Sequence, residues 1–208
     1  MDSHPYHTVI TYINCSAGVK AASDIICTSS NAEKNINSLP DDEKIIFAPD
    51  KYLGAYLQKK TGHDLLLWDG SCQVHEIFSE SELIRIKTRN PEALILAHPE
   101  CDENILRHSD HIGSTTSIIK FANKSNHEKF IIATEPGVIH QMEKESPNKI
   151  FIPLPTNDGC ACNECPHMRL NTIEKMVTAL EKMELEIFLS EEVRLLALAP
   201  LEKMLALS

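Results

Sequence analysis

The chain has 208 residues, a hydrophobic fraction of 42% and a formal net charge of −10. Such an acidic chain disfavours nucleic acid as a partner, and its apolar runs are too short to cross a membrane. No signal-peptide pattern follows Met1, so we expect a cytoplasmic protein whose seven cysteines, an odd number, do not form a closed disulfide framework.

Short apolar runs alternate with helical patterns along the chain, and most of them end in a polar or proline-containing corner. The predicted strands lie at residues 8–13, 25–26, 44–48, 65–68, 93–97, 130–133 and 150–152. Strands that are apolar on both faces and alternate with helices predict parallel sheets covered on both sides. Ligands bind beyond the carboxyl ends of such strands, which is where these corners lie.

The pattern changes between Phe78 and Ala93, and we place a boundary there. The predicted fold class is therefore α/β, with two similar α/β units at residues 1–85 and 86–208. The second unit contains a cysteine loop at residues 159–166 and ends in helices.

Two C-terminal helices are predicted from apolar spacing and from their first residues. One extends from Thr172 to Met183, and the other begins after Ser190 and continues to about Leu207. Pro200 lies well inside the second helix and is expected to kink it or break it in two.

The cysteine loop contains Cys160, Cys162 and Cys165 in the spacing C-x-C-x-x-C. Cysteines this dense, without a secretory signal, are typical of metal ligands. Pro166 follows the last of them, as in iron–sulfur loops where proline turns the chain away from the cluster. A small zinc site formed by these cysteines with His167 is an alternative, although a zinc ribbon normally has two separate ligand pairs.

Other candidate groups lie at strand ends. Cys72 follows the strand at 65–68, and His75 lies three residues further on. Taken alone, these two are more simply interpreted as a buried thiol and a satisfied polar residue. His98 and Glu100 flank a proline at a strand-to-helix corner, where a fixed backbone suits general acid–base chemistry. The alternative is an ordinary helix start with Glu100 near its positive end.

Two hydroxyl-rich stretches, residues 28–32 and 113–117, each precede a helix. Hydroxyls and free backbone N–H groups at a helix start bind anions, although either stretch alone is more simply a cap. Their joint occurrence at strand ends favours an anionic substrate. Tyr12 and Asn14 end the first strand and are suited to orient a substrate, or else are a half-buried tyrosine and a turn residue.

The combination of these motifs resembles one enzyme family, quinolinate synthase, an iron–sulfur enzyme of NAD biosynthesis. The resemblance extends over essentially the whole chain. It is carried by Tyr12-Ile-Asn-Cys-Ser-Ala-Gly, Cys27-Thr-Ser-Ser-Asn-Ala, Phe47-Ala-Pro-Asp-Lys-Tyr-Leu-Gly, Gly70-Ser-Cys-Gln-Val-His-Glu, His98-Pro-Glu, Gly113-Ser-Thr-Thr-Ser, Ala133-Thr-Glu-Pro-Gly and Cys165-Pro-His-Met-Arg-Leu-Asn.

The resemblance implies a fold and a reaction. Proteins of this family consist of three similar three-layer αβα domains with short parallel sheets around a central cavity. They condense iminoaspartate with dihydroxyacetone phosphate to give quinolinate. A [4Fe–4S] cluster is held there by three cysteines, one from each domain, and its open iron acts as a Lewis acid. Residues 1–85 and 86–208 would then be the second and third family domains.

The resemblance also implies roles for particular residues. Cys72 and Cys165 would be cluster ligands. Glu100, with His98, would be the catalytic group that transfers protons. The residues implied to bind substrate are Tyr12, Asn14, Ser29, His98, Glu100, Ser114 and Thr115.

Nothing in this sequence matches the first family domain, with its cluster cysteine. Cys160 and Cys162 depart from the family spacing and are not assigned as ligands. We expect two cysteines to hold a [4Fe–4S] cluster poorly unless a separately encoded first domain completes the site, and we expect an apolar face where that domain would dock. The alternatives are a remnant without catalytic activity and a zinc-binding interaction module.

Overall fold

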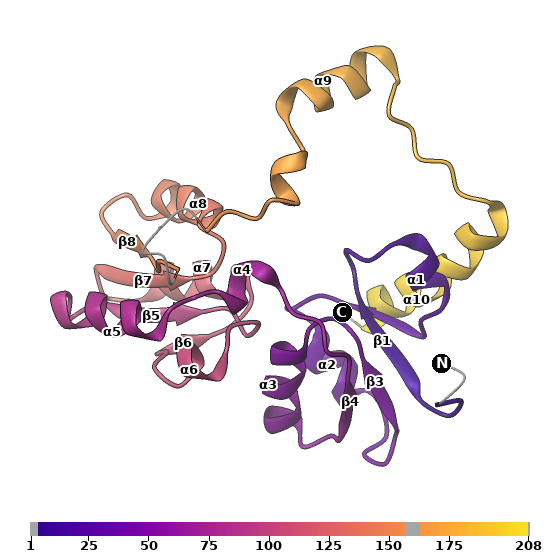
Figure 1. Cartoon of the computed structure of the whole chain (residues 1–208), viewed down its shortest axis with the longest axis horizontal. Helices are drawn as coiled ribbons and strands as arrows, with labels where there is room; N and C mark the ends of the chain where they lie inside the picture. The colour runs from indigo at the N-terminus through magenta and orange to yellow at the C-terminus, as the bar shows by residue number, and fades with distance from the viewer. Residues whose placement is uncertain (1–3, 157–162, 208) are drawn as a thin grey trace.

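The computed structural model of the chain describes residues 4–156 and 163–207, and it contains two four-stranded parallel sheets (Figure 1). The first sheet has the spatial order β2-β1-β3-β4, formed by β1 Thr8–Tyr12, β2 Ile25–Cys27, β3 Ile45–Phe47 and β4 Leu65–Leu67. The second has the order β6-β5-β7-β8, formed by β5 Leu94–Ala97, β6 His111–Ile112, β7 Lys129–Ala133 and β8 Ile150–Pro153.

Helices connect these strands and complete the chain. Those in the first part are α1 Ala17–Ala21, α2 Ala32–Asn37, α3 Lys51–Thr61 and α4 Gln73–Glu76. Those around the second sheet are α5 Glu80–Arg89, α6 Glu103–Leu106, α7 Thr115–Lys124 and α8 Gly137–Glu145. The C-terminal part contains a 3-10 turn at Met168–Leu170, α9 Ile173–Lys182 and α10 Glu191–Leu207.

Both sheets have the same topology. In each, the chain first moves from a central strand to one edge and then crosses to the other side of that central strand. The strand order therefore reverses between β1 and β3, and again between β5 and β7. In open parallel sheets, such reversal points leave a crevice at the carboxyl ends of the strands, where ligands bind.

The second sheet is covered by helices on both faces because side chains alternate along its strands. Ile95 and Ile131 pack in one buried cluster with residues of α5 and α6. Leu96 and Ile132, one position further along each strand, pack in another cluster with residues of α7 and α8. This explains why the strands read as continuous apolar runs.

The first sheet is closed by helices from both ends of the sequence. Ile10, Ile45 and Phe47 pack with residues of α2 and α3 in one buried cluster. The last helix, α10, returns to this half of the molecule and packs against α1 and β2 (Figure 1).

The predicted α/β fold class is confirmed, and each of the seven predicted strands is present. The sequence prediction missed β6, because His111–Ile112 is a two-residue edge strand without an apolar run. Both C-terminal helices are present, and α10 continues without a break through the buried Pro200.

The predicted boundary after residue 85 remains a prediction. Helix α5 spans it and packs on the second sheet through Leu83 and Ile86, whereas α10 packs on the first sheet. Among residues 4–156 and 163–207, no helix combines the length and the apolar composition that a membrane crossing requires.

Candidate active site

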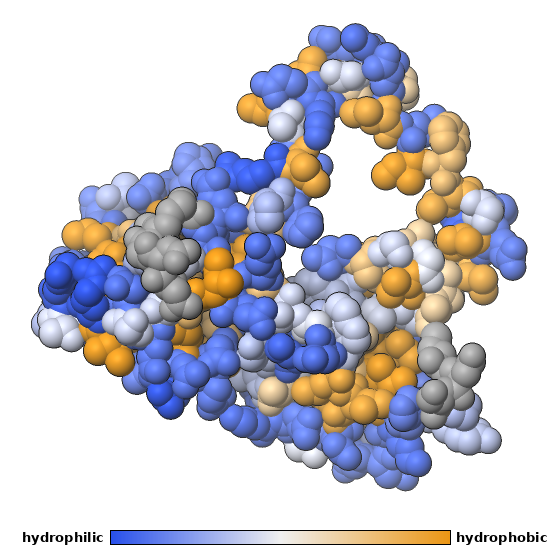
Figure 2. All heavy atoms as spheres, viewed as in Figure 1, coloured by the Kyte–Doolittle hydropathy of each residue, from blue (hydrophilic) through white to orange (hydrophobic). Residues whose placement is uncertain are grey.

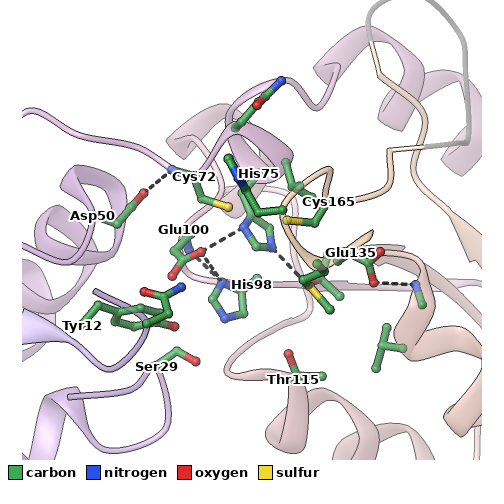
Figure 3. A pocket seen from close by; sticks show the side chains of 18 of the residues that line it. Tyr12, Ser29, Asp50, Cys72, His75, His98, Glu100, Thr115, Glu135 and Cys165 are labelled. Carbon is green, nitrogen blue, oxygen red and sulfur yellow. Dashed lines mark hydrogen bonds and ion pairs between the residues drawn. The ribbon is translucent and has the colours of Figure 1, made fainter. Parts of the chain in front are cut away.

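A cavity of about 1250 Å³ lies where the carboxyl ends of the two sheets meet (Figure 3). The first sheet contributes Tyr12, the last residue of β1, and Asp50 after β3. The second contributes Glu100 after β5 and Thr134 after β7. Both topological reversal points therefore open into one cavity, as expected for a ligand site in parallel α/β sheets.

Four buried side chains form a compact cluster in this cavity. The Nδ1 atom of His75 lies 3.0 Å from Oε2 of Glu100, and Nε2 of His75 lies 3.0 Å from Oγ1 of Thr134. The His98 ring stacks on the His75 ring with centroids 4.5 Å apart, and its Nδ1 lies 3.6 Å from the same Glu100 oxygen. His75 is on α4, so the cluster joins the two sheets.

The two histidines of the cluster differ in protonation state because their pKa values shift in opposite directions. Burial opposes the charge on His75, but its contacts with Cys72 and Glu100 favour the charge and raise the pKa of His75 to about 9. Burial, together with the charge on His75, lowers the pKa of His98 to about 4. Burial of Glu100 works against ionisation, yet the two histidines hold its pKa below the usual range. At neutral pH the cavity thus contains a charged His75–Glu100 pair beside a neutral imidazole.

Two thiols face the same cavity. Cys72 lies at the start of α4, and Cys165 precedes the 3-10 turn; both line the cavity and are partly exposed (Figure 3). The Sγ atom of Cys72 and ligand atoms of His75 and Glu100 all lie within 4.8 Å of one another. Thiolate, imidazole and carboxylate are suitable donors for a transition-metal ion, so this group could hold a metal.

Asp50 also belongs to this site and connects two strand ends. Its carboxylate caps α3 by accepting a hydrogen bond from the backbone N–H of Leu53, and its second oxygen accepts one from the backbone N–H of Cys72. The residue is 2% exposed. Burial, together with the charge of Glu100, raises the pKa of Asp50 above its usual value, against the effect of these hydrogen bonds.

Hydroxyl and amide groups occupy another part of the cavity wall, formed by Tyr12, Asn14, Ser29 and Thr115. Burial and the charge of Glu100 raise the pKa of Tyr12, so its phenol remains a hydrogen-bond donor. Ser114 does not line the cavity: it is buried, and its Oγ caps α7 by accepting from the backbone N–H of Ser117 at 3.3 Å.

Comparisons with known proteins show the family of this chain. A model of the NadA family, described as quinolinate synthetase A protein, matches residues 1–206. The chain belongs to the quinolinate synthetase A family. Relatives named quinolinate synthase include one from Synechocystis sp. (58% identical over 205 residues), one from Trichodesmium erythraeum (55% over 206) and one from Chloroherpeton thalassium (56% over 206). Each alignment covers 99% of this chain and 64% of the relative, so the chain spans less than two thirds of the relatives' length.

Half of the cysteine loop at residues 159–166 lies outside the described residues. Cys160 and Cys162 fall in the gap between residues 156 and 163, so the zinc alternative that includes them is untested. The two other residues of that alternative, Cys165 and His167, line the main cavity.

Sequence reasoning missed the central residue of the site in this family member. Taken alone, the sequence favours a satisfied polar residue at this position; His75 does have polar partners, Glu100 and Thr134, and it also stacks on His98 inside the cavity. One signal was available, because residues three apart on a helix share a face, and His75 is three residues after Cys72. Asp50 and Thr134 follow strands in the same way as the predicted residues and lie within two of the motifs that carry the resemblance, but the sequence assigned neither of them a role.

Proposed function

We propose that this chain provides two of the three units of a quinolinate synthase, which condenses iminoaspartate with dihydroxyacetone phosphate to quinolinate with loss of phosphate and water. The observation that carries this proposal is the placement of two thiols and a histidine–carboxylate cluster in one cavity at the strand ends of both sheets. The names of the relatives support the same reaction.

Cys72 and Cys165 would hold the cofactor of this reaction, a [4Fe–4S] cluster, together with a third thiolate from outside the residues described. The donor set fits such a group, because two partly exposed thiols that line the same cavity match the thiolate ligation of iron–sulfur clusters. When bound, a cluster with an open iron supplies Lewis-acid polarisation of a substrate oxygen.

The other cavity side chains would transfer protons or bind substrate, according to their charge. Glu100 is ionised and is suited to accept a proton, while the charged His75 beside it favours an anionic substrate. His98 is neutral, and its Nδ1 faces the backbone N–H of Glu100 at 3.4 Å, so it can act as a hydrogen-bond partner without adding charge. Tyr12, Asn14, Ser29 and Thr115 would orient carboxylate and phosphate oxygens.

A further domain-sized segment would complete the site. The matched region covers 64% of each relative, so more than a third of each relative's length lies outside the match. Helix α9 and the segment 183–190 form an arch away from both sheets, with apolar residues exposed along it (Figures 1 and 2). Ile173, Met176, Val177 and Leu180 are between 44% and 80% exposed and share one face of α9. We propose that this apolar face docks the remaining segment.

The test is reconstitution under anaerobic conditions. The chain is incubated with iron and sulfide, alone and with the part of the Synechocystis relative that this chain does not match. We expect about four irons per complex and quinolinate formation only when that segment is present. Iron uptake without turnover in the complex would contradict the proposed reaction, and no iron in either sample would favour a remnant without activity.

A further inference from the structure

The Asp50 carboxylate accepts hydrogen bonds from the backbone of two elements, the first turn of α3 and the start of α4. Its Oδ1 accepts from the N–H of Leu53 and its Oδ2 accepts from the N–H of Cys72, both at 2.8 Å. Cys72 is the residue from which α4 begins, so this second hydrogen bond sets the start of the segment that carries both the thiol and His75.

The same loop is attached to the first sheet at further points. The backbone N–H of Trp68 donates to Phe47 at 3.0 Å, and that of Lys51 donates to Gly70 at 2.8 Å. These contacts bring the end of β4 beside the end of β3. The hydrogen bond from Cys72 to Asp50 is the last of this series and the one nearest to the thiol.

A carboxylate at this position does more than a helix cap requires. An asparagine or serine also caps a helix. Asp50 is buried, and among residues 4–156 and 163–207 no cation forms an ion pair with it. Burying a carboxylate without a cation is costly, so it needs hydrogen-bond donors. The backbone N–H of Cys72 donates to the second carboxylate oxygen of Asp50. An asparagine side chain has only one oxygen and would lack this second acceptor.

We propose that Asp50 is a positioning residue for the metal ligand Cys72: it fixes the backbone of Cys72 so that the thiol points into the cavity beside His75 and Glu100. This inference rests on the proposed function only in taking Cys72 as a metal ligand. Replacing a side chain that orients a residue bound directly to a metal commonly lowers the metal affinity by about 10–100-fold.

The test uses the whole chain in its metal-free form with Co²⁺ as the probe. Co²⁺ bound to a thiolate gives a charge-transfer absorption that reports the ligand directly. In Asp50→Asn, the single amide oxygen can satisfy either Leu53 or Cys72 but not both. Asp50→Ser keeps the cap of α3, but its side chain is too short to reach Cys72 as well. Ser79→Ala is the matched control, because it removes the cap of a helix of similar length, α5, away from the cavity.

We expect two changes in both Asp50 variants and neither in Ser79→Ala. The Cys72 amide loses its protection from hydrogen exchange, measured by NMR without any metal, and the Co²⁺ affinity falls about 10–100-fold. Unchanged exchange at Cys72, or changed exchange with wild-type Co²⁺ affinity, would overturn the inference. Absence of a thiolate band in the wild-type chain is a different failure: it would remove the ligand itself, and with it the metal site of the proposed function.

Discussion

The rings of His75 and His98 stack with their centroids 4.5 Å apart and their planes inclined by 18°, yet their pKa values lie on opposite sides of neutrality. His75 has the better contact with Glu100, 3.0 Å against 3.6 Å, and so carries the proton. A second proton on the neighbouring ring would repel the first at close range. The pair therefore supplies one cation and one neutral imidazole to the cavity.

This arrangement predicts how stability depends on pH. Burial and the charge on His75 lower the pKa of His98 from 6.5 to about 4 in the folded chain. A depressed folded pKa gives stability that is present above pH 6.5 and lost as the pH falls through about 4. We expect His98→Asn to show a shallower decline of the thermal midpoint across this window than the wild type. Parallel curves for the two proteins would contradict the assignment.

Cys72 and Cys165 are predicted to be metal ligands, whereas Cys101 is predicted to be a buried core residue with no ligand role. Cys72→Ser and Cys165→Ser should each lower the iron retained after anaerobic reconstitution with the completing segment, because both side chains line the cavity. Iron and sulfide counting on gel-filtered protein measures this.

Cys101→Ser is the matched control for these two variants. Cys101 is fully buried and donates to the carbonyl of Ala133 at 3.3 Å, a bond that a serine hydroxyl can keep. Its iron content should equal that of the wild type. Equal losses in all three variants would point to unfolding rather than to ligand removal.

Ser114 and Thr115 are adjacent but should respond differently to replacement. Ser114→Ala removes the cap of α7 and should lower the free energy of unfolding by about 1 kcal/mol. Thr115→Ala removes a cavity hydroxyl and should raise the KM of the completed enzyme with a smaller loss of stability. Chemical denaturation and steady-state kinetics on both variants distinguish the two roles. A KM effect confined to Ser114→Ala would reverse this assignment.

The apolar face of α9 is predicted to matter for association and not for the fold of this chain. Leu180→Glu places a charge on a residue that is 80% exposed, so the thermal midpoint of the chain alone should change little. Binding of the completing segment, followed by analytical ultracentrifugation, should weaken by at least about tenfold, because a charge would be buried at the contact.

Glu181→Lys is the control on the neighbouring exposed position of α9. It changes charge without adding a polar group to the apolar face. If both variants associate as the wild type does, the segment docks elsewhere.

Much of the fold could be predicted because the strands are encoded locally. Runs such as residues 44–48 and 130–133 are apolar on both faces, which specifies a strand between two helical layers. The strand ends followed from the same runs, so Tyr12, His98 and Glu100 could be placed at the edge where the cavity lies. The edge strand His111–Ile112 escaped prediction because it has too few buried residues to leave a pattern.

The site itself depends on contacts between distant parts of the chain. Whether Cys72 is a core thiol or a ligand is not determined by its neighbours in sequence, since both interpretations suit a strand end. His75 gains its role from Thr134, 59 positions away, and from Glu100 on the other sheet.

The sequence by itself thus determined the layered parallel fold, the polar strand ends and the family, because these follow from short-range patterns of apolar and polar residues. Only the tertiary structure decided which histidine carries the proton, which of Ser114 and Thr115 faces the cavity, and what Asp50 holds. The physical reason is that charge and hydrogen bonding depend on burial and on partners, and folding brings these partners together from both sheets.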